Sequence, residues 1–426
     1  MSKKVVLITL AVAFAVALLA VGCGGGQPAT QEVKPIKIGV IYPMSGDLAV
    51  IGADQKAAME LAQQIINGEY NLNMPLAKTK GLPNLKNAPI QLIFADSQGK
   101  PEVARSEAER LINQEKVVAL LGAYASSSTA PSSQVAERYG VPYVTPESTR
   151  ADLTERGYKW FFRNIPYDAM AVEEQFKFLA ELKKQGKDLG NIGIANENSL
   201  WGQGSADEQK KLAGKYGFKV AAAVAYPKEI TDVTSEVLKL KAANVNTLLI
   251  TAYVNDSILF QKTIKEQNLN LNAIIGLEGG HVAKEFIPAL GKSAEFVLTS
   301  ATWSPGLIAS KEICGKVNAM FKEKKGRDMS AYQPHAFTAV MVLADAINRA
   351  GSTDPEVIRK AIVETNYPGE SLIMPWKGVK YDNKGQNTFG TPLFLQIING
   401  KYEVVYPADI ATKKVVWPMP QWSERK

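Results

Sequence analysis

A hydroxyl-rich segment follows one of the expected strands and could hold a small anion. Residues 122–131 read Gly-Ala-Tyr-Ala-Ser-Ser-Ser-Thr-Ala-Pro and lead into an expected helix at residues 130–139. The first turn of a helix has free backbone N–H groups and the positive end of the helix dipole, which together favour a carboxylate. Ser126 and Ser127 are therefore candidate ligand contacts. Helix capping by these serines would explain the same residues without any ligand.

Two further loops place polar side chains at the ends of expected strands. Residues 145–150 read Thr-Pro-Glu-Ser-Thr-Arg, and the candidate contacts among them are Glu147, Ser148 and Thr149. Residues 276–280 read Gly-Leu-Glu-Gly-Gly, so Glu278 stands on a glycine-rich loop where it could pair with a ligand cation. An ordinary loop at 145–150 and a solvated Glu278 are the alternatives that remain open.

Two aromatic residues also follow expected strands. Residues 198–204 read Asn-Ser-Leu-Trp-Gly-Gln-Gly and expose Trp201 between flexible turns, and residues 251–253 end a strand with Tyr253. In open α/β sheets, ligands bind outside the carboxyl ends of the strands, which makes both rings candidate ligand contacts. Either ring could equally belong to a core.

No catalytic motif competes with these loops. The chain has no G-x-S-x-G elbow, no G-x-x-x-x-G-K-[ST] phosphate loop, no H-E-x-x-H and no G-x-G-x-x-G after the first strand. It has only two histidines and two cysteines, so nucleophilic hydrolases that depend on Ser/His or Cys/His pairs are hard to build. An enzyme is the weakest interpretation.

The elements that must position these loops alternate between β-rich and helical patterns. This alternation predicts parallel sheets built from βα units. Strands are expected at residues 36–42, 90–95, 117–121, 141–144, 192–195, 218–223, 247–251 and 273–276. Helices are expected near residues 102–114, 130–139, 169–182, 314–327, 334–349 and 355–365, and two closing strands at 393–398 and 402–406. Residues 67–88 resemble an inserted surface loop.

The N-terminus has the order of a secretory signal. Lys3 and Lys4 precede an apolar run at residues 5–21 that ends in Gly22 and Cys23. The run is shorter than the roughly 20 residues that a membrane-spanning helix needs. Ala-Val-Gly-Cys at residues 20–23 resembles the lipobox of bacterial lipoproteins, which implies cleavage before a lipidated Cys23.

Composition excludes several classes of site. The net charge of +7 is a mild excess spread along the chain, so we expect no nucleic-acid partner. With Cys23 lipidated, Cys314 is the only remaining thiol and an internal disulfide cannot form. His281 and His335 offer no zinc-type spacing. We expect no metal and no cofactor.

A series of short motifs then identifies a family. The motifs are, in order, Ile38-Gly39-Val40, Met44-Ser45-Gly46, Ala95-Asp96, Ser126-Ser127-Ser128-Thr129, Trp160-Phe161-Phe162-Arg163 and Gly202-Gln203-Gly204. In this order they make nearly the whole mature chain resemble the branched-chain amino-acid (Leu/Ile/Val) binding proteins of ABC importers, which are type I periplasmic binding proteins. The resemblance implies an α/β fold of two Rossmann-like, doubly wound lobes joined by three crossovers, with a ligand cleft between them.

The resemblance also implies a domain organisation and a set of partners. The expected parts are a signal peptide at 1–22, a flexible tether at 23–35, one lobe from 36–162 plus 303–388, and another from 163–302 plus 389–426. The implied protein is a monomer outside the cytoplasm, anchored to a membrane through Cys23, that delivers an amino acid to an ABC permease and ATPase complex.

In the family, the matching residues grip both charged ends of an amino acid. Ser126 and Thr149 hold the α-carboxylate, Glu278 and the Thr149 hydroxyl meet the α-ammonium, and rings at Trp201 and Tyr253 cover the ligand. This chain departs from the enteric proteins at Glu147-Ser148, Arg150, Ile51 and Tyr124, so its side-chain pocket is rebuilt. A branched-chain ligand is therefore not assured. Another small carboxylate or amide, such as an aromatic acid, and a role as the input protein of a receptor remain open.

Overall fold

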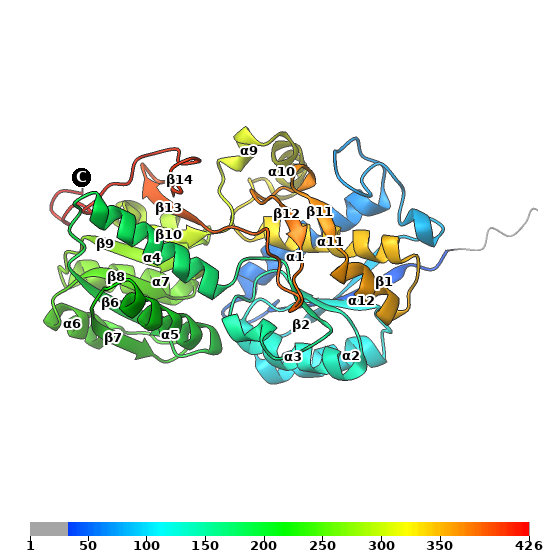
Figure 1. Ribbon diagram of the computed structural model, residues 1–426, viewed down its shortest axis with the longest axis horizontal. Coiled ribbons are helices and arrows are strands. Elements are labelled where there is room, and N and C mark those ends of the chain that lie inside the picture. Colours follow the sequence, from blue (N-terminus) through cyan, green and yellow to red (C-terminus); the bar gives the residue numbers. More distant parts are fainter. Residues whose placement is uncertain (1–32, 426) are drawn as a thin grey trace, which may run out of the picture. The chain divides into compact units, whose positions relative to one another are not determined.

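The chain folds around two β-sheets, each of which forms the centre of one lobe (Figure 1). The computed structural model describes residues 33–425. The expected signal peptide, Cys23 and nearly all of the expected tether lie outside the described residues. The chain from Pro35 onwards forms one compact unit.

The first sheet has five strands in the order β2-β1-β3-β4-β5, all parallel. The strands are β1 (Ile36–Tyr42), β2 (Ile90–Asp96), β3 (Ala119–Gly122), β4 (Tyr143–Thr145) and β5 (Phe161–Arg163). Strand order reverses between β1 and β3, and the carboxyl ends of all five strands meet at one edge. Such a reversal is the place where open α/β sheets bind ligands.

Helices cover both faces of this sheet, and together they form lobe one. Alternate residues of β1 face opposite ways, so Ile38 and Val40 pack into one core while Ile41 packs into another. The helices of lobe one are α1 (Ala49–Asn67), α2 (Pro101–Asn113), α3 (Ser126–Tyr139), α10 (Glu312–Lys325), α11 (Gln333–Ala350) and α12 (Pro355–Val363). Helix α11 has apolar residues on nearly every side, and it is therefore buried nearly all round.

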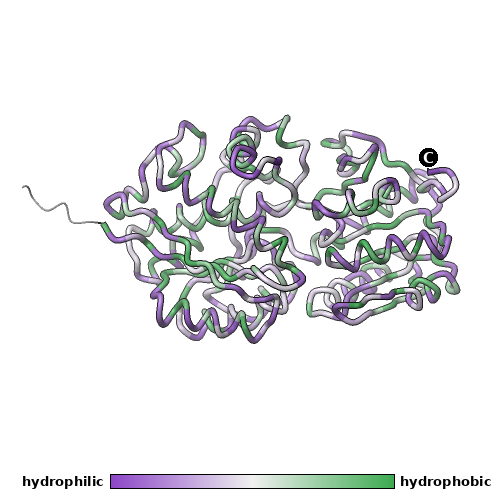
Figure 2. Tube along the Cα trace, turned by 180° about the vertical axis from the view of Figure 1, so that it is seen from behind, coloured by the Kyte–Doolittle hydropathy of each residue, from purple (hydrophilic) through white to green (hydrophobic). Residues whose placement is uncertain are grey.

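The second sheet has seven strands in the order β14-β13-β10-β9-β8-β6-β7. Its strands are β6 (Asn191–Glu197), β7 (Val220–Tyr226), β8 (Val245–Thr251), β9 (Ala273–Leu277), β10 (Leu298–Ala301), β13 (Leu393–Ile398) and β14 (Lys401–Tyr406). The first five are parallel, whereas β13 and β14 extend the sheet in antiparallel fashion. Figure 2 shows the hydrophobic positions running along the strands of both sheets.

Helices again cover both faces and complete lobe two. They are α4 (Asp168–Lys184), α5 (Leu200–Lys215), α6 (Thr234–Ala242), α7 (Val254–Glu266) and the short α8 (Phe286–Leu290). The chain passes between the lobes near residues 164–167, 302–306 and 388–392. The predicted architecture of two doubly wound lobes with three crossovers is thus confirmed.

Some local predictions are wrong. The helix expected at 130–139 begins at Ser126, so the serines occupy its first turn and do not precede it. Residues 67–88 are no simple surface loop, because Leu72, Met74 and Leu82 are buried in the core of lobe one. Elements to which the sequence patterns assigned no range include helices α5 to α8, strands β5 and β10, α9 (Leu307–Ser310) and the small sheet of β11 (Asn366–Pro368) and β12 (Gly378–Lys380).

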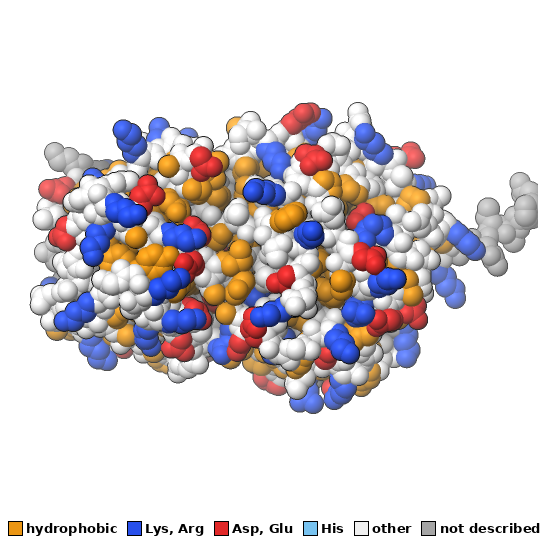
Figure 3. Space-filling model, in the orientation of Figure 1, with side chains coloured by type: hydrophobic (Ala, Val, Ile, Leu, Met, Phe, Trp, Pro, Cys, Tyr) orange, Lys and Arg blue, Asp and Glu red, His pale blue; other side chains and the backbone are white. Residues whose placement is uncertain are grey.

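The surface carries mixed charge. On the face shown in Figure 3, Lys and Arg side chains alternate with Asp and Glu side chains, which is typical of a solvated surface. Within residues 33–425, no helix combines the length and the apolar character needed to cross a membrane.

Candidate functional site: a cleft between the two lobes

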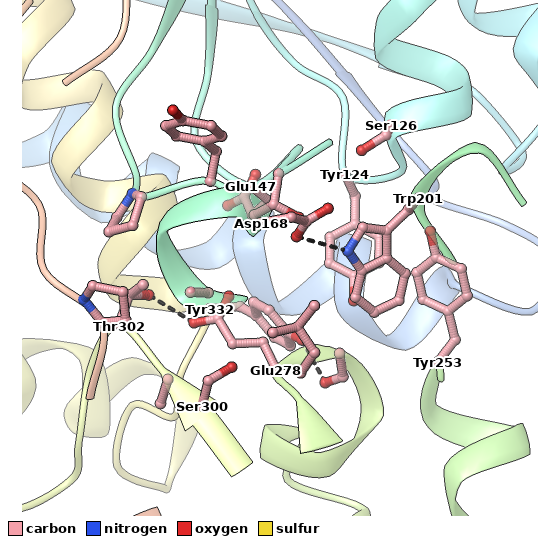
Figure 4. Close-up of a pocket in the computed structure, with 18 residues that line it drawn as sticks. Tyr124, Ser126, Glu147, Asp168, Trp201, Tyr253, Glu278, Ser300, Thr302 and Tyr332 are labelled. Atoms are coloured by element: carbon pink, nitrogen blue, oxygen red, sulfur yellow. Dashed lines mark hydrogen bonds between the residues drawn. The ribbon is translucent and has the colours of Figure 1, made fainter. Parts of the chain in front are cut away.

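A cavity lies where the carboxyl ends of the two sheets face each other (Figure 4). The loops after β3 and β4 line it from lobe one, and the loops after β8 and β9 line it from lobe two. The polar and aromatic side chains that line it are Tyr124, Ser126, Glu147, Thr149, Tyr167, Asp168, Trp201, Tyr253, Glu278, Ser300, Thr302 and Tyr332.

The start of α3 offers neutral hydrogen-bond donors to this cavity. Its N-cap is Ala125, which has no side chain that could cap the helix, so capping does not explain the serines. The amides of Ser128 and Thr129 donate to the Ala125 carbonyl, whereas those of Ser126 and Ser127 have no partner within the helix. Free N–H groups and the helix dipole make this wall attractive to a carboxylate.

The loop after β4 contains residues that hold the loop in place and residues that line the cavity. The Ser148 hydroxyl is buried and donates to the Ala123 carbonyl oxygen at 2.8 Å, which ties this loop to the one after β3. Thr149 lies where the lobes meet, and its carbonyl oxygen accepts the amide of Asp168 at 2.9 Å. Glu147 is 7 % exposed and accepts a hydrogen bond from the hydroxyl of Tyr42.

Glu278 lines the cavity from lobe two on a constrained backbone. It has φ of +47°, a region that costs a non-glycine residue free energy and that is found mainly at functional sites. Its Oε1 accepts a hydrogen bond from the Thr302 hydroxyl at 2.8 Å, which orients the carboxylate. Burial raises the pKa of Glu278 to about 7, against the lowering effect of that hydrogen bond.

Asp168 is a second acid on this side, at the first residue of α4. Its carboxylate accepts the Trp201 indole N–H at 3.2 Å and the Ser205 hydroxyl at 3.1 Å. Burial raises the pKa of Asp168 to about 6, although these hydrogen bonds and the nearby Arg163 guanidinium lower it. Asp168 therefore fixes the position of the Trp201 ring.

Aromatic rings form a continuous wall around the cavity. The ring centroids of Trp201 and Tyr253 are 4.8 Å apart, those of Tyr253 and Tyr124 are 5.9 Å apart, and Tyr332 meets Tyr124 edge-on at 5.5 Å. These rings come from both lobes and exclude water from one side of the site.

Direct contacts join the lobes around the cavity. The Tyr332 hydroxyl donates to the carbonyl oxygen of Gly279, and the Arg150 guanidinium donates to the carbonyl oxygen of Leu200 at 2.6 Å. Asp54 on α1 accepts Lys284 of lobe two at 2.6 Å. Each contact needs the lobes close together, so the structure represents a closed arrangement.

The crossovers are held by a buried arginine. Arg163 at the end of β5 is fully buried and donates to the Arg150 carbonyl oxygen and to Gln386 Oε1, both at 2.6 Å. Gln386 in turn donates to the Ile165 carbonyl oxygen at 2.8 Å. The crossing segment at residues 164–167 is thereby bonded to the residues just before the one at 388–392.

Seven of the nine predicted ligand contacts line this cavity. They are Tyr124, Ser126, Glu147, Thr149, Trp201, Tyr253 and Glu278. The side chains of Ser127 and Ser148 do not line it, because Ser148 bonds to neighbouring loop atoms and Ser127 contributes only its position in the first turn of α3. Four residues that line the cavity were not predicted from the sequence. Asp168 begins α4 and Ser300 lies on the unpredicted strand β10. Thr302 lies on a crossover, and Tyr332 directly precedes α11.

The site has the character of a binding site. In the part of the chain that the structure describes, no cluster of His, Cys, Asp and Glu has the arrangement of a metal site. His281 and His335 are fully buried, and burial lowers the pKa of His281 to about 4 and that of His335 to about 3, so both are neutral at pH 7. Two lobes closed over a polar and aromatic cavity define a ligand-capturing protein.

Comparisons with known proteins agree with this class. The sequence profile of the family described as "Periplasmic binding protein" matches residues 35–400. The chain is 28% identical over 410 residues to Leu/Ile/Val-binding protein homolog 7 of Brucella abortus (strain 2308), covering 92% of this chain and 96% of that relative. The chain belongs to the periplasmic binding protein family, and the family resemblance inferred from the motifs is confirmed.

Solved structures share the fold. The leucine binding protein LivK from Thermotoga maritima MSB8 has a TM-score of 0.74 at 24% identity, covering 87% of this chain and 97% of LivK. LivJ from Streptococcus pneumoniae, solved in complex with isoleucine, has a TM-score of 0.74 at 21% identity, covering 88% of this chain and 100% of LivJ. The fold is that of type I periplasmic binding proteins.

Proposed function

We propose that this protein is the substrate-binding lipoprotein of an ABC importer, and that it captures an amino acid by closing its two lobes and delivers it to the permease. The observation that carries this proposal is the pairing of unlike groups across one cavity. Free N–H groups at the start of α3 face the cavity from lobe one, and the Glu278 carboxylate lines it from lobe two. An α-amino acid has the two charges that match these walls.

The residues have distinct roles in this proposal. The Ser126 hydroxyl, the first amides of α3 and Thr149 bind the α-carboxylate. Glu278, oriented by Thr302, binds the α-ammonium. Trp201 and Tyr253 cover the ligand from lobe two. Because each end of the ligand is held by a different lobe, the ligand stabilises the closed state.

The transport role follows from the family and from the names of the relatives. This chain is similar to Leu/Ile/Val-binding protein homologs and to structures titled as branched-chain amino acid transporter components. Lipidation of Cys23 would keep the protein at the membrane beside its permease. A Cys23→Ser variant should lose incorporation of labelled palmitate and should leave the membrane fraction, whereas equal labelling of variant and parent would contradict the anchor.

Thermal unfolding of ligand-stripped protein tests the ligand class. The panel contains the amino acids and a set of aliphatic and aromatic carboxylates without an amine. A ligand at about 100 times its Kd should stabilise the protein by about 2.7 kcal/mol. Stabilisation by a group of amino acids supports the proposal. Stabilisation only by acids that lack an amine would contradict it and would assign the cleft to a carboxylate.

A further inference from the structure

The cavity contains more acid than a zwitterionic ligand can balance. Three carboxyl groups line it, from Glu147, Asp168 and Glu278, and its lining contains no Lys, Arg or His. Asp168 has the nearby Arg163 guanidinium as a counter-charge, together with two hydrogen-bond donors. Glu278 is the partner proposed for the ligand ammonium. Glu147 is therefore the acid without an assigned role.

Glu147 also has an unused hydrogen-bonding atom. Its Oε2 accepts the Tyr42 hydroxyl, but its Oε1 is buried and has no hydrogen-bond partner within residues 33–425. The Ser300 hydroxyl, which lines the cavity from lobe two, also lacks a partner among the residues described. Buried polar atoms in native proteins are nearly always paired, so these two atoms point to a partner supplied by the ligand.

The surroundings of Glu147 favour a cation as that partner. Burial raises the pKa of Glu147 well above its ordinary value, and the charge of Glu278 adds to the effect although the Tyr42 hydrogen bond opposes it, so the empty site favours the protonated acid. A cation placed against Oε1 would favour the ionised form, because its charge compensates that of the carboxylate. The aromatic wall acts in the same direction, because the faces of Tyr124, Tyr253 and Trp201 carry negative potential that attracts cations.

We propose that Glu147 and Tyr42 form a side-chain subsite for a second ligand nitrogen, so that the substrate class is a basic amino acid such as lysine, ornithine or arginine. This inference rests on the proposed function for the α-amino and α-carboxyl ends of the ligand. An aliphatic side chain at this position would leave Glu147 Oε1 buried without a donor, at a cost in free energy.

The test compares matched ligands by calorimetry on the purified, ligand-stripped protein. Lysine and norleucine differ in whether the side chain ends in an ammonium, and glutamine supplies an uncharged donor. We expect lysine, ornithine or arginine to bind at least about tenfold more tightly than norleucine, since loss of a partner from a buried charge pair is costly. Tighter binding of norleucine, leucine or glutamine than of all three would overturn the subsite.

Variants assign the preference to Glu147. Glu147→Gln keeps the shape of the side chain and should reduce the preference for the basic amino acid over norleucine by about tenfold or more. Tyr42→Phe removes only the hydroxyl that orients Glu147 and should reduce this preference by a smaller factor. Glu364→Gln removes an exposed charge of lobe one and should leave the preference unchanged. An unchanged preference in both Glu147→Gln and Tyr42→Phe would contradict the proposal.

The outcomes separate this inference from the proposed function. If apolar amino acids bind and basic ones do not, the amino-acid function stands and the Glu147 subsite is wrong. If no α-amino acid binds, the proposed function itself fails, and the subsite fails with it.

Discussion

The two walls of the cleft differ in chemistry. On lobe one, the start of α3 supplies neutral N–H and hydroxyl groups that suit an anion, and Glu147 adds one buried carboxyl group on the loop after β4. On lobe two, Glu278 and Asp168 supply carboxylates, and Trp201 and Tyr253 supply rings. A ligand that carries both charges meets its full set of partners only when the lobes close, which explains how binding can be coupled to closure without any chemical step.

Contacts between the lobes that do not involve the ligand also hold the closed state. The pair of Asp54 and Lys284 and the bond from Tyr332 to Gly279 lie outside the charged ends of the site. They stabilise the closed state, but a ligand must add enough differential affinity to make it dominant.

The largest expected loss of ligand affinity comes from Glu278, on the wall that lobe two forms. Glu278→Gln should weaken binding of the cognate amino acid by about 2–5 kcal/mol, because the ligand ammonium loses its charged partner in a buried site. Isothermal titration calorimetry measures the change. Glu266→Gln, at an exposed position of α7, is the matched control and should bind as the parent does. Equal affinities in all three proteins would remove Glu278 from the ammonium site.

Substitutions at the start of α3, on lobe one, should change ligand affinity less. Ser126→Ala should weaken binding by about 1.5–3 kcal/mol, the range for a hydrogen bond to a charged group. Ser127→Ala is a close control, because that side chain does not line the cavity although its backbone amide starts the same helix. Similar losses in both variants would indicate damage to α3 and not the loss of a ligand contact.

The pH dependence of ligand affinity should include a contribution from Glu278. Burial raises the pKa of Glu278 to about 7, so in the empty protein it begins to take up a proton near neutral pH. Because an ammonium ligand needs the ionised form, affinity should fall below pH 7 by at most about 1.4 kcal/mol per pH unit for one proton. Titrations between pH 5.5 and 8.5 should show a shallower slope in Glu278→Gln, and an equal slope would contradict the assignment.

The same shift predicts a pH effect on stability with the opposite sign. The folded pKa of Glu278 lies above its unfolded value, so the empty folded protein binds more protons than the unfolded chain between about pH 4.5 and 7. The contribution of Glu278 to the free energy of unfolding is therefore greatest at low pH and decreases as pH rises through this window. Denaturant unfolding of the empty parent and of Glu278→Gln should converge at low pH and diverge towards pH 8.

The smallest effect is expected at the pair that joins the lobes beside the cleft. Asp54→Asn should lower ligand affinity by only about 0.5–1 kcal/mol, since Lys284 is one-third exposed and can be solvated when the pair is lost; the same change removes the partner of Arg327 within lobe one. Small-angle scattering of the empty variant should show a larger radius of gyration. Asp345→Asn breaks a pair with Arg349 inside α11 and should leave both quantities unchanged. An equal response of the two variants would remove Asp54 from the closure contacts.

The sequence predicted the repetitive part of the molecule well. The β-rich run at residues 36–42 matches β1, and the runs at 247–251 and 273–276 fall within β8 and β9, because central strands of parallel sheets are apolar throughout. Strands β5 and β10 were missed, and their length of three and four residues does not explain this, because β3 and β4 are equally short and were predicted.

The site was only partly predictable from the sequence. Motifs on strand-end loops identify Ser126, Thr149 and Glu278 as candidates, but Tyr332 reaches the cavity only because α11, which it precedes, packs against α1 within lobe one. Asp168 has the sequence signature of an ordinary acid at a helix start, and its bond to Trp201 depends on how α4 and α5 pack. Such contacts arise from tertiary packing and have no local sequence signal.

The most direct test of the account compares the tightest-binding amino acid with its two truncated analogues, the deaminated acid and the decarboxylated amine, by calorimetry on the parent protein. If each lobe holds one charged end, both analogues should bind at least about 100-fold more weakly, because each leaves one wall without its partner. Binding of the deaminated acid within tenfold of the amino acid would contradict the account, since Glu278 would then have no ammonium to hold.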